Sequence, residues 1–242
     1  MYAIITTNLT KHYNKLPAVK QLSLQIERGE LFSLLGVNGA GKTTTIKMLT
    51  CLTEPSEGDA LVGGFSILKA PSQVKSKIGV SPQETAVAPN LSVQENLELI
   101  CGIHGFSRDK TREKIQELAG LFSLDEVLTR KAGKLSGGWQ RRVSIAMALI
   151  SEPEILFLDE PTLGLDVLVR HELWDVIRSL KGRVTVILTT HYLEEAESLS
   201  DRIGIMKDGM LLAVGTSNEL KRKAGTLDFE GAFVTIVKEN GK

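Results

Sequence analysis

The stretch from Gly36 to Thr43 constrains this chain most, because it fits the pattern G-x-x-x-x-G-K-[ST]. An apolar run, Leu31-Phe-Ser-Leu-Leu35, comes directly before it, and a helical pattern over residues 42–52 follows. A glycine-rich turn between a strand and a helix lets backbone N–H groups surround phosphate oxygens, and the helix N-terminus adds its partial positive charge. The sequence therefore predicts a strand–loop–helix unit that binds the phosphates of a nucleotide.

Individual positions of this loop have separate expected roles. Lys42 is expected to reach the β and γ phosphates, and the Thr43 hydroxyl to ligate Mg²⁺. The residues expected to contact the nucleotide are Gly36, Asn38, Gly39, Ala40, Gly41, Lys42, Thr43 and Thr44. The motif predicts a nucleotide-binding P-loop and leaves the class of protein open.

A second apolar run, Ile155-Leu-Phe-Leu158, ends in two acids, Asp159 and Glu160. Asp159, at the carboxyl end of a predicted strand, suits the outer ligand sphere of Mg²⁺. Glu160 is placed to polarise a water molecule for in-line attack on the γ-phosphate. This pair favours hydrolysis over phosphoryl transfer to another substrate.

A third motif, Leu135-Ser-Gly-Gly138, precedes a helical pattern that runs to about Ser151. Ser136 is a favourable N-cap residue, and Gly137 and Gly138 leave backbone N–H groups accessible. The chain is therefore predicted to carry two anion-binding helix N-termini but only one P-loop.

With these motifs in this order, the sequence resembles the ATP-binding subunits of ABC transporters over about residues 2–220. Ser136, Gly137 and Gly138 match that family's signature motif. The other matches are Tyr13 for the aromatic residue that stacks on adenine, Gln83 for the Q-loop glutamine near Mg²⁺, Asp166 for the D-loop and His191 for the switch histidine. The resemblance implies that Glu160 and His191 are catalytic, and that the cofactors are ATP and Mg²⁺.

Some of these positions also have plainer interpretations. Tyr13 suits an ordinary edge-strand aromatic, Gln83 a polar loop residue and His191 a buried core histidine. Trp139, after the signature glycines, is expected to face outward or toward a partner. Trp174 follows the apolar stripe of a predicted helix and is expected in the core.

The hydrophobic pattern predicts an α/β fold. The apolar runs at 31–35, 155–158 and 184–188, with a helical pattern over 168–180, are typical of a parallel sheet covered on both faces. Alternating runs at 4–9 and 22–26 predict an antiparallel flap, and residues 207–210 a hairpin turn. The resemblance implies a P-loop NTPase core with a mostly parallel sheet, an antiparallel β subdomain and a helical insertion.

The expected domain organisation follows from the same resemblance. An ATP-binding domain is expected over residues 2–220, with a helical subdomain at about 84–150. Residues 221–242 are expected to form a short C-terminal extension.

The resemblance also implies a dimer in which Ser136, Gly137, Gly138 and Asp166 of one copy complete the ATP site of the other. The second copy is either this same chain or another ABC ATPase. Further expected partners are integral membrane permease subunits, moved through the helical insertion, and the expected location is cytoplasmic and peripheral on the inner face of the cell membrane. The run from Leu188 to Glu197 resembles the ATPases of bacterial multidrug, antibiotic and sodium exporters.

Composition sets further limits. Lys+Arg and Asp+Glu both number 29, so the net charge is 0 and no nucleic-acid partner is expected. No apolar run approaches the ~18 residues that cross a bilayer, and the N-terminus lacks the pattern of a secretory signal. Cys51 and Cys101 match no metal-ligand spacing and are expected to be reduced thiols.

Two other classes of protein remain as alternatives. A non-transport ABC ATPase acting on ribosomes or DNA usually carries two ATPase halves, a long coiled coil or zinc cysteines, and the sequence has none of these. A P-loop kinase has no use for the motif around Gly137 or for Glu160 after Asp159.

Overall fold

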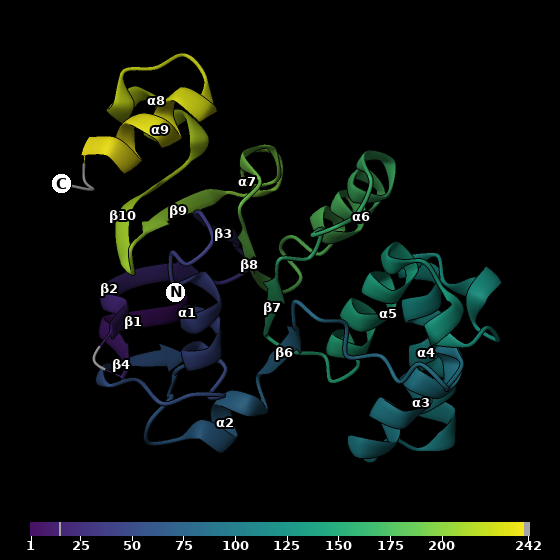
Figure 1. The fold of residues 1–242 in the computed structure, drawn as a ribbon. Coiled ribbons are helices and arrows are strands. Elements are labelled where there is room, and N and C mark those ends of the chain that lie inside the picture. The colour runs from purple at the N-terminus through teal and green to yellow at the C-terminus, as the bar shows by residue number, and fades with distance from the viewer. Residues whose placement is uncertain (15, 240–242) are drawn as a thin grey trace.

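The computed structural model describes residues 1–14 and 16–239, and its centre is a six-stranded sheet (Figure 1). The strands, in the order β10-β9-β3-β8-β7-β6, are Met210–Gly215, Arg202–Lys207, Leu31–Leu35, Thr185–Thr190, Ile155–Asp159 and Ile78–Ser81. All neighbours are parallel except β10 and β9. Every residue of β3, β7 and β8 is buried, which explains their continuous apolar sequences. The predicted parallel sheet is confirmed.

The predicted antiparallel flap is a four-stranded sheet, and its first two strands extend beyond the alternating runs at 4–9 and 22–26. Its order is β2-β1-β4-β5, with strands Leu16–Glu27, Tyr2–Tyr13, Glu57–Val62 and Phe65–Ser66. Helix α1 (Lys42–Leu49) joins the two sheets, because Ile46, Met48 and Leu49 share one buried cluster with residues of β1, β4 and β7. This packing fixes the helix that follows the P-loop.

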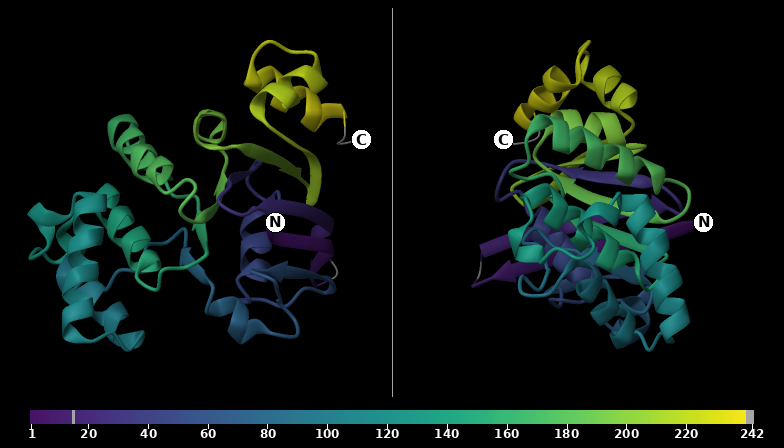
Figure 2. Two further views of the ribbon diagram at one scale, coloured as in Figure 1. Left: turned by 180° about the vertical axis from the view of Figure 1, so that it is seen from behind. Right: turned by 90° about the vertical axis from the view of Figure 1, so that its right-hand side faces the viewer.

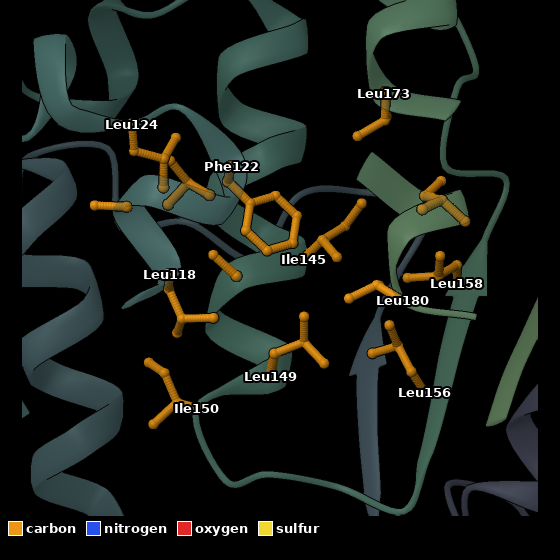
Figure 3. Close-up of a cluster of buried hydrophobic side chains, with 14 of the residues drawn as sticks. Leu118, Phe122, Leu124, Ile145, Leu149, Ile150, Leu156, Leu158, Leu173 and Leu180 are labelled. Carbon is orange, nitrogen blue, oxygen red and sulfur yellow. The ribbon is translucent and has the colours of Figure 1, made fainter. Parts of the chain in front are cut away.

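The predicted helical insertion contains α3 (Val93–Ile103), α4 (Arg108–Phe122) and α5 (Gly137–Leu149). Short 3₁₀ turns, Asp125–Val127 and Ala132–Lys134, connect α4 to α5. Figure 3 shows Leu118 and Phe122 of α4 facing the α5 side chains of Ile145 and Leu149. The same cluster reaches Leu156 and Leu158 of β7 and helix α6 (Val167–Ser179), so the insertion packs against the main sheet.

The remaining helices are α2 (Pro71–Lys75), α7 (Leu193–Leu199), α8 (Ser217–Ala224) and α9 (Phe229–Glu239). In both views of Figure 2, α8 and α9 lie at the opposite end of the molecule from α3–α5. Phe229, Ala232 and Ile236 of α9 pack with Leu35 and Ile203 of the main sheet. Residues 240–242 of the expected C-terminal extension lie outside the described part of the chain.

Smaller predictions have mixed outcomes. The hairpin turn at 207–210 is confirmed, and Asp208 and Gly209 have the positive φ angles, 50° and 80°, that such a turn favours. Trp174 is in the core as predicted. The Trp139 ring is partly buried: one part packs against the helical core, with the Arg142 guanidinium 5.1 Å from the ring centroid, and the rest stays exposed. No helix within residues 1–14 and 16–239 has both the length and the hydropathy to span a membrane.

Candidate ATP site

The candidate site lies where the carboxyl ends of four neighbouring parallel strands meet. Gly36 follows β3, Gln83 comes two residues after β6, Glu160 follows β7 and His191 follows β8. Loops after parallel strands lie at one edge of the sheet, where open α/β sheets bind their ligands. The topology therefore brings together four motifs that are far apart in the sequence.

A cavity of about 410 Å³ opens at this edge. Its lining comprises Ala18, Asn38, Gly39, Ala40, Gly41, Lys42, Thr43, Thr44, Gln83, Glu160, Leu163 and His191. Gly41 has φ 101°, and a Cβ there would lie 2.5 Å from the Ala18 carbonyl oxygen, so only glycine fits. Helix α1 begins at the next residue, and the first N–H groups of a helix have no acceptor within it. These groups suit a phosphate.

Lys42 is buried beside the P-loop and faces an acid. Its Nζ donates to the Gly36 carbonyl oxygen at 2.7 Å and lies 3.4 Å from Glu160 Oε1. Both side chains are less than a tenth exposed. The two side chains form a buried ion pair, and pairing offsets the cost of burying each charge. The predicted phosphate-binding lysine and the predicted hydrolytic carboxylate therefore face the same space.

Asp159 lies against the first turn of α1. Its Oδ1 accepts a hydrogen bond from the Thr43 hydroxyl at 3.1 Å and another from the Thr189 hydroxyl. Hydroxyl and carboxylate oxygens are the ligands that Mg²⁺ prefers. The two residues proposed from separate motifs as metal residues are therefore in direct contact.

Glu160 occupies an unusual backbone conformation, with φ 48°. Its N–H donates to the carbonyl oxygen of Thr189 at 3.1 Å and to the hydroxyl oxygen at 3.0 Å. Its Oε2 lies 2.8 Å from His191 Nδ1. A non-glycine residue at positive φ is sparsely populated and persists where the surroundings fix it, which is common at functional sites. The turn aims the carboxylate at His191 and Lys42.

Gln83 lines the cavity, and its backbone is held by the helix that carries the signature motif. Arg141 of α5 donates from Nη1 to the Pro82 carbonyl oxygen at 2.6 Å and from Nη2 to that of Gln83 at 2.5 Å. Burial lowers the pKa of the Arg141 guanidinium, and the nearby Asp159 and Glu195 carboxyl groups oppose that shift. The contact spans 58 residues of sequence, and no local pattern indicated it.

The other predicted site residues do not line this cavity. Ser136 is the N-cap of α5, and the Asp166 side chain caps α6 by accepting from the Val169 N–H at 3.0 Å. Tyr13 is half-exposed at the end of β1, with the Lys11 ammonium 5.3 Å from its ring centroid. Gly138 touches α6 so closely that a Cβ would lie 2.3 Å from Val169 Cγ1. Ser136, Gly138 and Asp166 thus lie outside the cavity of their own chain.

Thr189, Thr162 and Glu195 are polar residues beside the site that the motifs did not identify. Thr189 connects Asp159 to the Glu160 backbone, and Thr162 donates to Glu195. The signal for Thr189 was the polar end of an otherwise apolar strand, Val184-Thr-Val-Ile-Leu-Thr-Thr190.

Comparison with known proteins agrees with this site. The ABC transporter family profile matches residues 19–163. The chain is 42% identical, over 226 residues, to the doxorubicin resistance ATP-binding protein DrrA of Mycobacterium tuberculosis, covering 92% of this chain and 68% of that protein. It is 40% identical, over 219 residues, to the linearmycin resistance ATP-binding protein LnrL of Bacillus subtilis, covering 90% and 70%.

Solved structures show the same fold. An ATP-binding subunit of an ABC transporter superposes with a TM-score of 0.86 at 28% identity, covering 97% of this chain and 99% of that one. An ATP-binding cassette in a dimeric, post-hydrolysis state bound to ADP and Pi gives a TM-score of 0.79 at 29% identity, covering 88% and 98%. The chain therefore belongs to the ABC transporter family and is an ATP-binding, ATP-hydrolysing subunit of that family's type.

Proposed function

We propose that this chain powers an exporter, and that Lys42, Glu160 and His191 carry out the hydrolysis. The observation that carries the proposal is the meeting of these three side chains in one cavity, with Glu160 within 3.4 Å of Lys42 Nζ and 2.8 Å of His191 Nδ1. The Lys42 ammonium neutralises phosphate charge, and the P-loop N–H groups orient the γ-phosphate.

Glu160 acts as the general base. Its carboxylate accepts a proton from a water molecule as that water attacks the γ-phosphorus in line with the bond to ADP. His191 holds the Glu160 carboxylate through Nδ1 and leaves its other ring nitrogen to face the γ-phosphate. The bond to the β-phosphate oxygen breaks, and the products are ADP and inorganic phosphate.

The residues around Asp159 fit a Mg²⁺ ion. Thr43 and Gln83 line the same cavity, and the Thr43 hydroxyl donates to Asp159, so a hydroxyl and an amide are available there with a carboxylate beside them. Mg²⁺, when bound, neutralises charge that develops on the β and γ phosphates. In this proposal Thr43 is a direct ligand, Gln83 supplies its amide oxygen and Asp159 orients ligands from outside.

The working unit is a dimer with two composite sites. Ser136, Gly137, Gly138 and Asp166 lie outside the cavity of their own chain, which supports a role in covering the phosphates held by a second copy. Tyr13, with its exposed ring, is proposed to stack on the adenine. ATP then forms part of the interface, and hydrolysis removes the contact that keeps it closed.

The proposed organisation has an ATP-binding domain over 2–220, a helical subdomain at about 84–150 and a C-terminal extension over 221–242. The helical subdomain passes the motion of the dimer to integral membrane permease subunits. The location proposed is the cytoplasmic face of the cell membrane. Export as the direction is supported by relatives that carry resistance to doxorubicin and linearmycin in their names.

Purification of the tagged chain from gently solubilised membranes tests this function. A stoichiometric multi-span membrane protein in the eluate supports the transporter, and its transport assayed in vesicles gives the direction. A second ATPase in the same complex identifies a heterodimer. Recovery with ribosomes or DNA, without a membrane protein, contradicts the proposal.

A further inference from the structure

Glu195 is a fully buried acid at the first turn of α7, four residues after His191. Its Oε1 accepts two hydrogen bonds, one from the Thr162 hydroxyl at 2.8 Å and one from Trp174 Nε1 at 3.0 Å. Its Oε2 is buried and makes no hydrogen bond within the described residues. An acid held this way needs an explanation, because an apolar residue would avoid the cost of burying it.

The Thr162 contact connects two segments that carry proposed catalytic residues. Thr162 comes two residues after Glu160, in the loop that follows β7, and is itself fully buried. Glu195 belongs to the segment after β8 that begins with His191. The two segments therefore contact each other at the Glu160–His191 pair in the cavity and at the Thr162–Glu195 hydrogen bond outside it.

The buried surroundings of Glu195 favour the neutral form of its carboxyl group. Burial raises the pKa of the Glu195 carboxyl, and the neighbouring Thr190, Thr162 and Trp174 groups and the Arg170 guanidinium lower it by less. Arg141 of α5 is the other cation that interacts with it. A neutral acid accepts both hydrogen bonds through its carbonyl oxygen without leaving a charge on Oε2. Glutamine has the same carbonyl oxygen and nearly the same shape.

The Glu160 turn needs such a restraint. Its φ of 48° is unfavourable for a residue with a Cβ, and such conformations persist only where the surroundings fix them. On one side of the turn, the Glu160 N–H donates to the Thr189 hydroxyl oxygen. On the other side, the Thr162 hydroxyl donates to Glu195 and so fixes the residues after Glu160. Loss of the Thr162–Glu195 hydrogen bond would let the Glu160 carboxylate move away from the attacking water. Even a small displacement of a catalytic group lowers the rate of the reaction strongly.

We propose that Glu195 is a positioning residue for ATP hydrolysis: through Thr162 it holds the Glu160 turn in register with the segment that carries His191. The proposal rests on the roles of Glu160 and His191 given above. It concerns the rate of hydrolysis and not the binding of ATP, because neither Thr162 nor Glu195 lines the cavity.

The test compares Thr162→Val and Glu195→Gln in the full chain, purified with its membrane partners. Thr50→Val is the matched control, since Thr50 is also buried and also donates one close hydrogen bond, to the Ile46 carbonyl oxygen at 2.8 Å. Thr162→Val is expected to lower kcat about tenfold or more, with KM for ATP within about twofold. Glu195→Leu, which cannot accept from Thr162, is expected to lower kcat as Thr162→Val does, and Glu195→Gln to restore most of it, because its carbonyl oxygen still accepts from Thr162.

Thermal unfolding separates positioning from general stability. Thr162→Val and Thr50→Val are expected to lower Tm by similar amounts, while only Thr162→Val lowers kcat. Equal kcat in Thr162→Val and Thr50→Val, with Glu160→Gln inactive in the same assay, overturns this inference alone. Wild-type turnover in Glu160→Gln instead overturns the proposed catalytic role of Glu160.

Discussion

His191 Nδ1 lies 2.8 Å from Glu160 Oε2, and this contact joins the ends of two neighbouring strands, β8 and β7. The other oxygen of the same carboxylate lies 3.4 Å from Lys42 Nζ. Glu160 is therefore held between a ring nitrogen and an ammonium group. Its orientation therefore depends on residues of two other motifs, and substitutions in each motif are expected to affect the ATPase cycle differently.

Replacing His191 with alanine tests the histidine contact. We expect kcat to fall by about a hundredfold, because Glu160 loses the partner that orients it. The dissociation constant for ATP is expected to change by less than about threefold. Phosphate release and ATP titration measure the two quantities. His104→Ala, at an exposed position in α3's C-terminal cap, is the control and is expected to behave as wild type. Wild-type kcat in His191→Ala would contradict the assignment.

Lys42→Ala tests phosphate binding. We expect the dissociation constant for ATP to rise about tenfold or more, since the variant loses the buried ammonium proposed to contact the phosphates. Calorimetric titration measures it directly. Lys47→Ala removes an exposed lysine from the same helix and is expected to leave the affinity unchanged. Equal ATP affinity in the two variants would rule out the proposed role of Lys42.

Gly138→Ala tests the contact between the signature helix and α6. The added Cβ would lie 2.3 Å from Val169 Cγ1, so we expect the free energy of unfolding to fall by about 1–3 kcal/mol. Val169→Ala makes room for that methyl group. The double variant is therefore expected to lose less stability than the two single variants added together. If the losses in the free energy of unfolding add, as measured by denaturant unfolding, the contact with Val169 is not the cause of the instability of Gly138→Ala.

The Glu195 carboxyl predicts a pH dependence of stability. Burial raises its pKa in the folded chain above the ordinary value of 4.5, so the fold favours the neutral acid. The stabilisation that comes from the neutral Glu195 carboxyl is complete below the ordinary pKa. It is lost as the pH rises through the raised pKa of the folded chain. Unfolding of wild type and Glu195→Gln is to be compared from about pH 4 to about pH 8. The stability of wild type relative to the variant is expected to decline with rising pH, and a constant difference would be evidence against the neutral acid.

The sequence predicted those parts of the fold that leave a local pattern. Strands β3, β7 and β8 are buried on both faces and therefore read as apolar runs. Strand β6 was missed, because it has four residues at the sheet edge and includes Gly79. That glycine is needed where α5 passes, since a Cβ would lie 2.2 Å from the Ala148 carbonyl oxygen.

The site was predictable wherever a motif combined residue type with spacing. The P-loop, Glu160 and His191 follow from such patterns, and the structure brings them into one cavity. The hydrogen bonds of Arg141 to the Gln83 backbone and of Thr162 to Glu195 span 58 and 33 residues. Such contacts depend on how the sheet and helices pack, and no local pattern carries them.

Glu160→Gln tests most directly whether Glu160 drives the hydrolysis of ATP held between two copies. The amide keeps the shape of the carboxylate but cannot accept a proton, so we expect kcat to fall by about a hundredfold or more. ATP binding is expected to persist and to trap the closed dimer. Light scattering of the purified variant with and without ATP measures this. We predict an ATP-dependent dimer without phosphate release. Turnover at the wild-type rate, or a monomer with bound ATP, would contradict it.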